Sequence, residues 1–375
     1  MIIIADDITG AAEIAGMARC QGLQTSLVCG CNVCCDDSDA DIVTVIATDT
    51  RSLTEEEAVE ETCRIASYIS HHTSAISHQP SAIFKKTDSA LRGHVVAELF
   101  TLMQATGKQR AVYLPANPTK GRIIRGGIYY IDGVPIHETD FRFDPEYPAF
   151  TSSMHERFPY AEEKGIIMPD AETENDIRRI VSQYDDGKTL FAGAADLLRN
   201  LLPSPSERKG ELQTKTTILS SPLDGDVRGL LIVCGSTQSR PLHPGIAVAP
   251  MPIELYDGSD DINLWDTSAY TSTDAVALTI PHHHRTGKDV AKHLRKVTAN
   301  KVRTLIGVHR PDHLVIEGGA TAWAILQALE WTHFTVVGQF APGVVQLLAD
   351  SGTLVTLKPG SYPWEKEKGK VKSEK

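Results

Sequence analysis

Two adjacent carboxylates follow the first apolar run of the sequence. Asp6 and Asp7 come directly after Ile2–Ala5, and Thr9 follows them closely. Paired acids at the end of a buried strand can bind sugar hydroxyls, hold Mg²⁺, or accept the proton of an attacking hydroxyl. Capping of the next helix by Asp7 or Thr9 is the structural alternative, and it accounts for one acid but not for both.

A second cluster combines cations, a hydroxyl and a carboxylate between a predicted strand and a predicted helix. Its members are Lys86, Asp88, Ser89 and Arg92. Cations near a helix N-terminus suit an anionic ligand, and an arginine can bind a carboxylate through two parallel hydrogen bonds. We therefore expect Arg92, together with Lys86, to hold an acidic group of a ligand. A solvated charged turn is the alternative.

The stretch Thr48–Ser52 repeats this pattern more weakly, with Arg51 between hydroxyl residues. A surface turn explains it equally well. We include Arg51 among the candidate ligand-binding residues because it also follows a predicted strand.

The second half of the sequence offers glycine turns instead of charge clusters. They occur at Gly235-Ser236, Gly318-Gly319, Pro342-Gly343 and Pro359-Gly360. Glycine lets the backbone approach a phosphate closely, and loop amides can then bind the phosphate oxygens. None of these turns matches the Walker A pattern or the dinucleotide fingerprint, so each alone is weak evidence.

The elements that must position these residues alternate between strand and helix. Strands are predicted at 2–5, 25–29, 41–47, 82–85, 111–114, 165–168 and 189–192, and helices at 9–19, from 52, 92–105 and 171–183. This alternation favours a mainly parallel sheet flanked by helices. The carboxyl ends of the strands in such a sheet are the usual place for ligands.

The segment 117–150 departs from the alternation and is rich in Gly, Pro and Tyr. Tyr129–Ile131 and Val134–Ile136 flank Asp132-Gly133, which predicts a β-hairpin. We expect an excursion from the first sheet here.

A second α/β segment begins at Gly229, with further strands near 275–280, 313–316, 335–337 and 353–358. We therefore predict an α/β fold with two domains, 1–205 and 228–364, each a mainly parallel sheet flanked by helices. Residues 206–227 are the predicted linker, and 365–375 the predicted flexible tail.

Composition excludes several classes of protein. The 375 residues carry 37 Lys and Arg against 48 Asp and Glu, a net charge of -11, so a nucleic-acid-binding surface is not expected. The apolar runs are too short for a membrane span. The N-terminus lacks the basic and apolar regions of a signal peptide, so we expect a cytoplasmic protein without a membrane partner.

These motifs together resemble the four-carbon acid sugar kinase family. The resemblance rests on Asp6–Ala11, Thr50–Leu53, Lys86–Gly93 and the run 115–148 with Gly121-Arg122, Gly133–Pro135 and Asp144-Pro145, and on the glycine turns of the second half in order. It implies an ATP- and Mg²⁺-dependent kinase of threonate, erythronate or 3-oxo-tetronate. It also implies that the first domain binds the sugar acid, that the second binds the nucleotide, and that a homodimer is possible.

The residue patterns and the resemblance together give three sets of candidates, of which the resemblance itself implies Asp6, Asp7, Ser89, Arg92, Ser236, Gly318 to Thr321 and Gly360. The catalytic candidates are Asp6, Asp7 and Asp88, and the substrate-binding candidates are Asp6, Asp7, Arg51, Lys86, Ser89 and Arg92. The ATP-binding candidates are Ser236, Gly318, Gly319, Ala320, Thr321, Gly343 and Gly360, and no metal ligand is assigned.

Two departures from the family pattern motivate an alternative. The family usually has an acid at the position of Ala320, and Ser361-Tyr362-Pro363 replaces the usual continuation after Gly360. The alternative is a non-catalytic sugar-acid-binding protein that no longer uses ATP. A nicotinamide-dependent dehydrogenase would fit the α/β pattern, but its fingerprint is missing.

Overall fold

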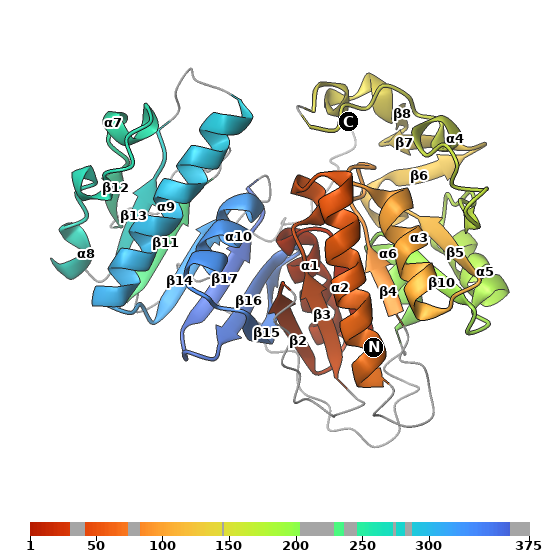
Figure 1. Cartoon of the computed structure of the whole chain (residues 1–375), viewed down its shortest axis with the longest axis horizontal. Helices are drawn as coiled ribbons and strands as arrows, with labels where there is room; N and C mark the ends of the chain where they lie inside the picture. Colours follow the sequence, from red (N-terminus) through yellow and green to blue (C-terminus); the bar gives the residue numbers. More distant parts are fainter. Residues whose placement is uncertain are drawn as a thin grey trace, which may run out of the picture. The chain divides into compact units, whose positions relative to one another are not determined.

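The computed structural model describes residues 1–30, 42–73, 83–144, 146–202, 229–235, 246–272, 275–281 and 287–360. The chain divides into two compact units (Figure 1). Unit 1 contains Met1–Ala11 and Gly30–Gln213, and unit 2 contains Ala12–Cys29 and Thr214–Lys375. Ala12–Cys29, which lie inside the predicted range 1–205, thus belong to unit 2. The predicted linker and tail lie outside the described residues.

Unit 1 contains a fully parallel six-stranded sheet. Its order is β3 (Val43–Ala47), β1 (Ile2–Ala5), β4 (Ile83–Lys86), β10 (Thr189–Gly193), β5 (Arg110–Leu114) and β9 (Ile166–Ile167). Ala5 pairs with Ala47 and Lys86, and Gly193 pairs with Lys86 and Leu114. The carboxyl ends of five strands are therefore in line, and the loops that follow them lie along one edge of the sheet.

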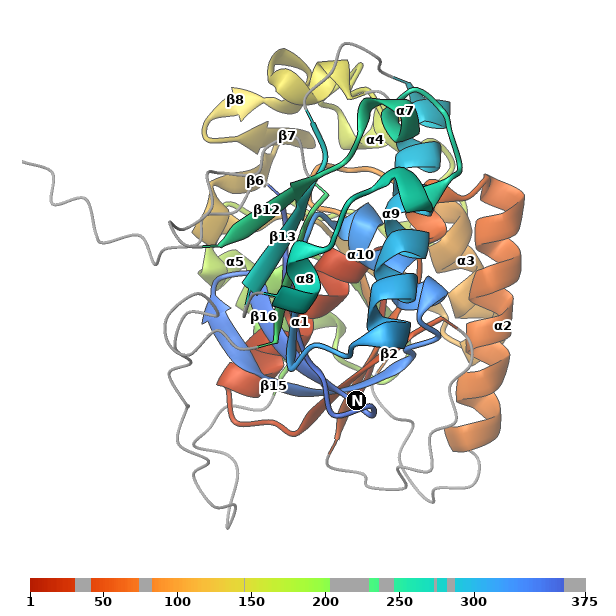
Figure 2. The same cartoon turned by 90° about the vertical axis from the view of Figure 1, so that its left-hand side faces the viewer.

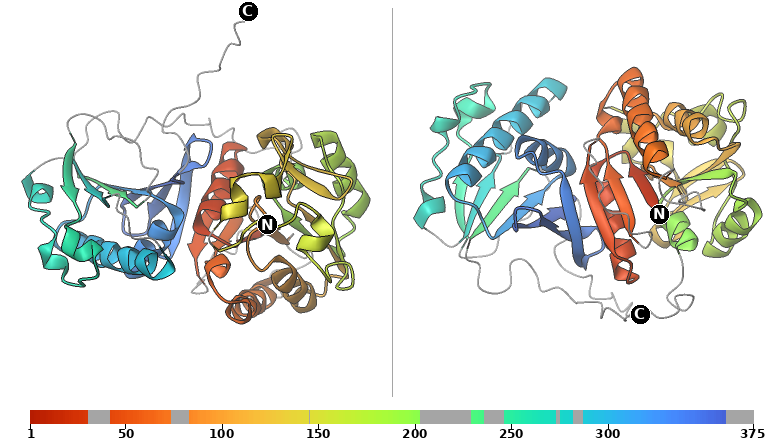
Figure 3. Two further views of the ribbon diagram at one scale, coloured as in Figure 1. Left: turned by 90° about the horizontal axis from the view of Figure 1, so that it is seen from above. Right: turned by 60° about the horizontal axis from the view of Figure 1, so that its bottom comes forward.

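Three of the four main helices of unit 1 were predicted, with starts up to three residues too early, and the helix Ala195–Leu201 was not predicted. The four are α2 (Glu55–Thr73), α3 (Val95–Thr106), α5 (Glu174–Tyr184) and α6 (Ala195–Leu201), and the chain leaves the unit within α1 (Ile8–Cys20). The Thr54 hydroxyl accepts a hydrogen bond from Glu57 N, and the Glu57 carboxylate accepts one from Thr54 N. This reciprocal cap fixes the start of α2. Helices α2 and α3 lie side by side on one face of the sheet (Figure 3).

The predicted hairpin is confirmed within an excursion between β5 and β9. Strands β6 (Arg122–Arg125), β7 (Ile128–Ile131) and β8 (Val134–Pro135) form a small antiparallel sheet. Asp132 and Gly133 connect β7 to β8 with φ angles of 51° and 81°. Positive φ at both turn residues matches the twist of the flanking strands. The short turns Ile136–Glu138 and Asp140–Phe143 and helix α4 (Met154–Arg157) complete the excursion.

Unit 2 contains a mixed sheet (Figure 2). Its order is β12 (Ala247–Pro250), β13 (Ala275–Thr279), β11 (Leu230–Cys234), β14 (His313–Glu317), β17 (Leu354–Lys358), β16 (Val344–Ala349), β15 (His333–Ala341) and β2 (Thr25–Cys29). The first five strands are parallel, and the last three join antiparallel. The long helices α9 (Lys288–Val308) and α10 (Gly319–Ala328) pack against each other.

The cores of both units are built from strands with almost continuous apolar runs. Ile3 and Ile4 of β1 and Leu231, Ile232 and Val233 of β11 are fully buried. Such runs are typical of parallel strands covered by helices on both faces. Among the described residues, no helix has the length and apolar character that crossing a membrane requires.

Candidate functional site

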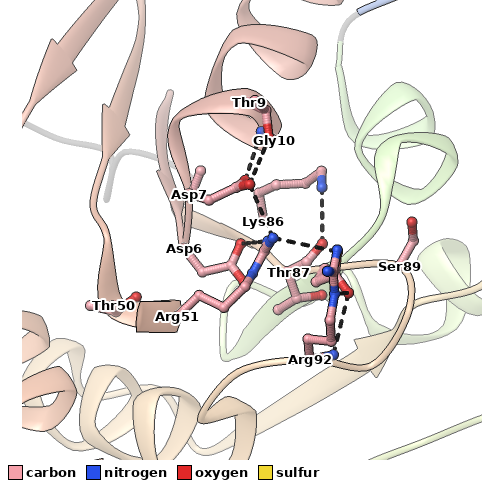
Figure 4. A network of polar contacts seen from close by, with 12 residues as sticks. Asp6, Asp7, Thr9, Gly10, Thr50, Arg51, Lys86, Thr87, Ser89 and Arg92 are labelled. Carbon is pink, nitrogen blue, oxygen red and sulfur yellow. Dashed lines mark hydrogen bonds and ion pairs between the residues drawn. The ribbon is translucent and has the colours of Figure 1, made fainter. Parts of the chain in front are cut away.

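The carboxyl edge of the unit 1 sheet brings six of the predicted residues together (Figure 4). Asp6 and Asp7 follow β1, Arg51 lies in the 3₁₀ turn Thr50–Ser52 after β3, and Lys86, Asp88 and Arg92 end or follow β4. The loop after β3 is tied to β1, because Thr48 N donates to Ala5 O at 2.9 Å and Arg51 N donates to Asp6 O at 3.3 Å. The predicted clusters therefore form one polar network.

Arg51 is the centre of this network. Its Nε donates to Asp6 Oδ2, and its Nη2 to both oxygens of Asp6, each at 3.0 Å. Its Nη1 lies 3.0 Å from Asp7 Oδ2 and 3.7 Å from Asp88 Oδ1. One guanidinium thus holds three carboxylates from two loops, and such charge-assisted pairs fix the relative geometry of those loops.

Asp7 also caps helix α1, as the capping interpretation predicts. Gly10 N donates to Asp7 Oδ1 at 2.7 Å, and the Thr9 hydroxyl donates to Asp7 Oδ2 at 2.6 Å. A Cβ atom at position 10 would lie 2.6 Å from Asp7 Oδ1 and 3.3 Å from Lys86 Nζ. Glycine at this position therefore lets the carboxylate and the lysine approach the helix.

Asp88 and Arg92 form a second bidentate pair. Arg92 Nε donates to Asp88 Oδ2 at 2.8 Å, and Arg92 Nη2 to Asp88 Oδ1 at 3.0 Å. Asp88 Oδ2 also accepts from Ala90 N at 2.9 Å. The loop carries Leu91 at a φ of 62°, a conformation that is costly for a side chain as large as leucine. The carboxylate of Asp88 thus organises a strained loop around Arg92.

The three carboxylates have different pKa shifts. Burial raises the pKa of Asp6, and the attraction of Arg51 offsets this only in part. Burial acts in the same direction on Asp7, but Arg51, Thr9, Lys86 and Gly10 together lower its pKa. Burial is also outweighed at Asp88, where Arg51 and Arg92 lower the pKa far below its usual range. Asp88 and Asp7 are therefore weaker bases than Asp6.

A buried ion pair fixes the turn that carries Arg51. Lys85 Nζ donates to Glu98 Oε2, and the side chains of both residues are almost completely buried. Glu98 Oε2 also accepts from the Thr50 hydroxyl at 3.0 Å. Thr50 precedes Arg51, so helix α3 and strand β4 together fix the turn that presents the guanidinium. Lys86 Nζ donates to Thr87 O at 2.9 Å.

The excursion contributes two residues, Asp144 and Tyr147, that were not among the predicted site residues. Asp144 Oδ2 lies 3.3 Å from Arg92 Nη1, and the Tyr147 hydroxyl donates to Arg51 O at 2.6 Å. Ser89 does not contact Asp6 or Asp7, and its hydroxyl accepts from Arg122 Nη1. Hydrophobic periodicity could not predict Asp144 and Tyr147, because they lie in the long excursion between β5 and β9, and tertiary contacts bring them to the site.

Asp196 is a further residue that was not among the predicted site residues. It follows β10, is completely buried, and accepts from Thr119 N at 2.9 Å and the Thr119 hydroxyl at 2.8 Å. The side-chain amide nitrogen of Asn117 donates to the same carboxylate, at 2.8 Å to Oδ2 and 3.0 Å to Oδ1. The sequence did carry a signal for this pair, because Asn117 follows β5 and Asp196 follows β10, and each is a polar residue just after the end of a strand.

The glycine turns of unit 2 also lie along one edge of a sheet. Cys234, Glu317 and Lys358 occupy one register row at the carboxyl ends of β11, β14 and β17. Val345 pairs with Leu357, which places the Pro342-Gly343 turn at the same edge. The predicted residues Gly318, Gly319, Ala320, Thr321, Gly343 and Gly360 thus share this edge, and Ser236 lies outside the described residues.

Helix α10 begins at this edge directly after β14. No side chain caps it, and Gly318 N donates to Lys358 O at 2.9 Å. Lys358 Nζ and Glu317 Oε1 form a completely buried ion pair at 3.2 Å. Backbone amides at an uncapped helix start can bind a phosphate. Among the described residues, no group of His, Cys, Asp or Glu side chains is arranged to hold a metal ion.

Two sequence families match the chain. Residues 1–159 match a family described as a sugar-binding N-terminal domain, and residues 263–362 match one described as a nucleotide-binding C-terminal domain. The first match contains the carboxylate and arginine network of unit 1. The second contains α10 and the turns at Gly343 and Gly360.

Curated relatives carry kinase names. A D-threonate kinase of Salmonella typhimurium is 28% identical over a match that covers 54% of this chain and 53% of the relative, about half its length. A 3-oxo-tetronate kinase of Brucella melitensis is 25% identical, and that match covers 97% of this chain and 93% of the relative.

A solved structure has the same fold. The Haemophilus influenzae protein HI1011 superposes with a TM-score of 0.67 at 19% identity, and the match covers 97% of both chains. At this identity the likeness concerns the fold alone.

Proposed function

Because the chain belongs to the four-carbon acid sugar kinase family, we propose that it is an ATP-dependent kinase that phosphorylates a hydroxyl of a four-carbon sugar acid. Threonate, erythronate and 3-oxo-tetronate are the substrate candidates. The observation that carries the proposal is the network in which Arg51 joins Asp6, Asp7 and Asp88 at the carboxyl edge of unit 1. Carboxylates can bind the hydroxyls of such a substrate, and nearby cations can attract its acid group.

Asp7 is our candidate for orienting the attacking hydroxyl. Its side chain is 19% exposed, whereas those of Asp6 and Asp88 are 3% and 11% exposed. A substrate can therefore reach Asp7 more easily than the other two. Phosphoryl transfer passes through a loose transition state, so positioning the hydroxyl matters more than the basicity of the acceptor. As the hydroxyl oxygen forms its bond to the γ-phosphorus of ATP, the bond from that phosphorus to the bridging oxygen breaks, ADP leaves, and the hydroxyl proton passes to the Asp7 carboxylate.

Asp6 and Asp88 act as positioning residues in this proposal. Asp6 uses both oxygens on Arg51, and Asp88 uses both on Arg92. The raised pKa of Asp6 keeps it as the alternative proton acceptor, since a base works best with a pKa near the operating pH. Ser89, Lys86 and Arg92 complete the substrate-binding set.

The edge of unit 2 fits the phosphates of ATP. Gly318 to Thr321 place backbone amides at the start of α10, and the turns at Gly343 and Gly360 lie along the same edge. ATP supplies the phosphoryl group when it is bound. We propose that Mg²⁺ is held largely by the nucleotide phosphates, because no cluster of metal-ligating side chains occurs among the residues described.

Ala320 does not remove this capacity. It is exposed in the first turn of α10, where its backbone amide, not its side chain, would bind a phosphate. An acid at this position would place a negative charge beside the phosphates. Alanine at this position is therefore compatible with ATP use. Thermal unfolding with and without ATP distinguishes the kinase from the alternative of a non-catalytic sugar-acid-binding protein.

Thermal unfolding of the purified protein with Mg·ATP, with a panel of four-carbon sugar acids and with both tests the proposal. A ligand that binds only the folded state raises the unfolding midpoint. We expect separate shifts with ATP and with one acid, followed by ADP release in a coupled assay. A shift with acids but none with ATP would support the non-catalytic alternative. No shift with any acid would overturn the proposed function.

A further inference from the structure

We propose that Arg122, which contacts the hydroxyl of Ser89, binds the carboxylate of the sugar acid and makes the site select acids over neutral sugars. This inference rests on the proposed function and extends it to a residue outside the predicted substrate-binding set. It is carried by the different surroundings of three arginines, Arg51, Arg92 and Arg122.

Arg51 and Arg92 already serve carboxylates of the protein. Arg51 lies within 3.0 Å of Asp6 and Asp7, and 3.7 Å from Asp88. Arg92 pairs with Asp88 at 2.8 Å and with Asp144 at 3.3 Å. An incoming carboxylate would meet these guanidinium groups together with two or three negative charges. Their main effect is therefore to order the loops of the site.

Arg122 lies beside the same site but makes no ion pair with any residue that the structure describes. Its Nη1 donates to the hydroxyl of Ser89, and its guanidinium lies 5.9 Å from the centre of the Phe141 ring. Arg92 lies 6.0 Å from the centre of the same ring. Both guanidinium groups thus lie near one aromatic side chain, and among the described residues only Arg92 of this pair is bound by acids.

The backbone on both sides of the Arg122–Ser89 contact is fixed. Asn117 N donates to Arg122 O at 2.8 Å, and Arg122 N donates back to Asn117 O at 3.2 Å. The Tyr129 hydroxyl donates to Ser89 O at 2.6 Å. A cation and a hydroxyl held in this way lose little freedom on binding a ligand, which favours affinity.

The chemistry of the guanidinium fits a carboxylate. It presents N–H donors in a planar fork that can bind both oxygens of the acid at once. The charge-assisted pair would hold the acid end of the substrate at Arg122 and leave its hydroxyls for Asp7. A neutral tetritol has no group that can replace this pair.

Binding measurements on the intact protein test the inference. The titrants are D-threonate, D-erythronate and the neutral tetritols threitol and erythritol, and the proteins are wild type, Arg122→Met and Arg122→Lys. We expect Arg122→Met to lose about 10- to 100-fold in affinity for the acid, since a hydrogen-bonded charge pair contributes on that order. Affinity for the tetritols should stay unchanged. Arg122→Lys should fall between the two proteins.

Arg125→Met is the matched control. Arg125 lies on the same strand, is exposed, and pairs with Glu172, and its ring contact is with Tyr130 instead of Phe141. This variant should bind the acid and the tetritols as wild type does. Unfolding without ligand shows whether each variant folds, and Ser89→Ala, expected to weaken acid binding selectively, tests the same contact if Arg122→Met does not fold.

The outcomes separate this inference from the proposed function. If wild type binds an acid and Arg122→Met keeps the preference for acid over tetritol, the inference is wrong and the proposed function stands. Equal losses for acid and tetritol would show a structural role of Arg122 and would also overturn the inference. If wild type binds none of the acids, both fail together.

Discussion

The guanidinium of Arg51 holds the carboxylate of Asp6 through its Nε and Nη2 atoms, with three N–O distances of 3.0 Å. Both side chains are largely buried, and they come from loops that follow neighbouring parallel strands. The pair therefore couples the end of β1 to the end of β3. A buried pair of this kind contributes geometry, and removing one partner is costly because it leaves the other charge uncompensated.

The first prediction concerns Arg51→Met. The carboxylate of Asp6 would remain buried without its partner, so we expect the free energy of unfolding at pH 7 to fall by about 3–5 kcal/mol. Urea unfolding followed by circular dichroism measures this. The variant should also lose binding of the sugar acid, because Asp7 and Asp88 lose their shared partner.

The pH dependence of Arg51→Met provides its control. Burial already raises the pKa of Asp6, and loss of the guanidinium removes the main effect that lowers it. The folded-state pKa then lies above the unfolded one, so lowering the pH protonates Asp6 and reduces the deficit. Asp6→Asn combined with Arg51→Met should recover part of the loss at pH 7. A deficit independent of pH would contradict this explanation.

The second prediction compares two glycines in helices. Glycine to alanine usually stabilises a helix by up to about 1 kcal/mol. At Gly10 the new Cβ would lie 2.6 Å from Asp7 Oδ1, so the cap must move, and we expect a net loss of about 1–2 kcal/mol. At Gly307 the Cβ would meet nothing within 4 Å, so Gly307→Ala should stabilise. Urea unfolding of both variants should give opposite signs, and stabilisation by Gly10→Ala would contradict the role of Gly10.

The site residues that the sequence predicted correctly as neighbours share a simple origin. Asp6, Asp7, Arg51 and Asp88 each lie just after a strand, and parallel strands place their carboxyl ends along one edge. Strand assignment alone therefore brings them together. What the pattern could not give is the pairing, in which Arg51 is the central cation.

The missed residues come from parts of the chain without a usable period. Asp144 and Tyr147 reach the site on the return path of the excursion, whose course depends on tertiary contacts. Strands β12 and β16 were also not predicted. In β16, Val344 to Leu347 are buried on both faces, so the alternation typical of strands is lost. β12 is a short edge strand that ends in Pro250.

The third prediction concerns pH and unit 2. His313 begins β14, and its Nε2 lies 2.8 Å from the Thr356 hydroxyl. Burial lowers the pKa of His313 from 6.5 to about 4. As the pH falls, His313 is therefore protonated in the unfolded chain before it is protonated in the folded protein. The contribution of its neutral imidazole to the free energy of unfolding is complete above pH 6.5 and is lost as the pH falls toward 4. The expected loss is at most about 3 kcal/mol.

Urea unfolding followed by tryptophan fluorescence checks this, because all four tryptophans lie at residue 265 or beyond. His313→Gln should flatten the dependence of unfolding free energy on pH between 7 and 4. His309→Gln, at an exposed histidine of the same unit, should leave the dependence as in wild type. An unchanged slope in His313→Gln would assign the pH dependence to other groups.

The last prediction concerns Gly235, whose N donates to Glu317 O at 3.0 Å. A Cβ atom at this position would lie 2.2 Å from Thr321 Oγ1 and 2.5 Å from Thr321 Cβ. Gly235→Ala must therefore displace the first turn of α10, and we expect ATP affinity to fall roughly tenfold. Stabilisation by the sugar acid should persist, because its proposed residues belong to unit 1. Thr321→Gly removes the three side-chain atoms in the way, so the double variant should bind ATP as well as Thr321→Gly alone. If Gly235→Ala binds ATP like wild type, the start of α10 is not the phosphate site.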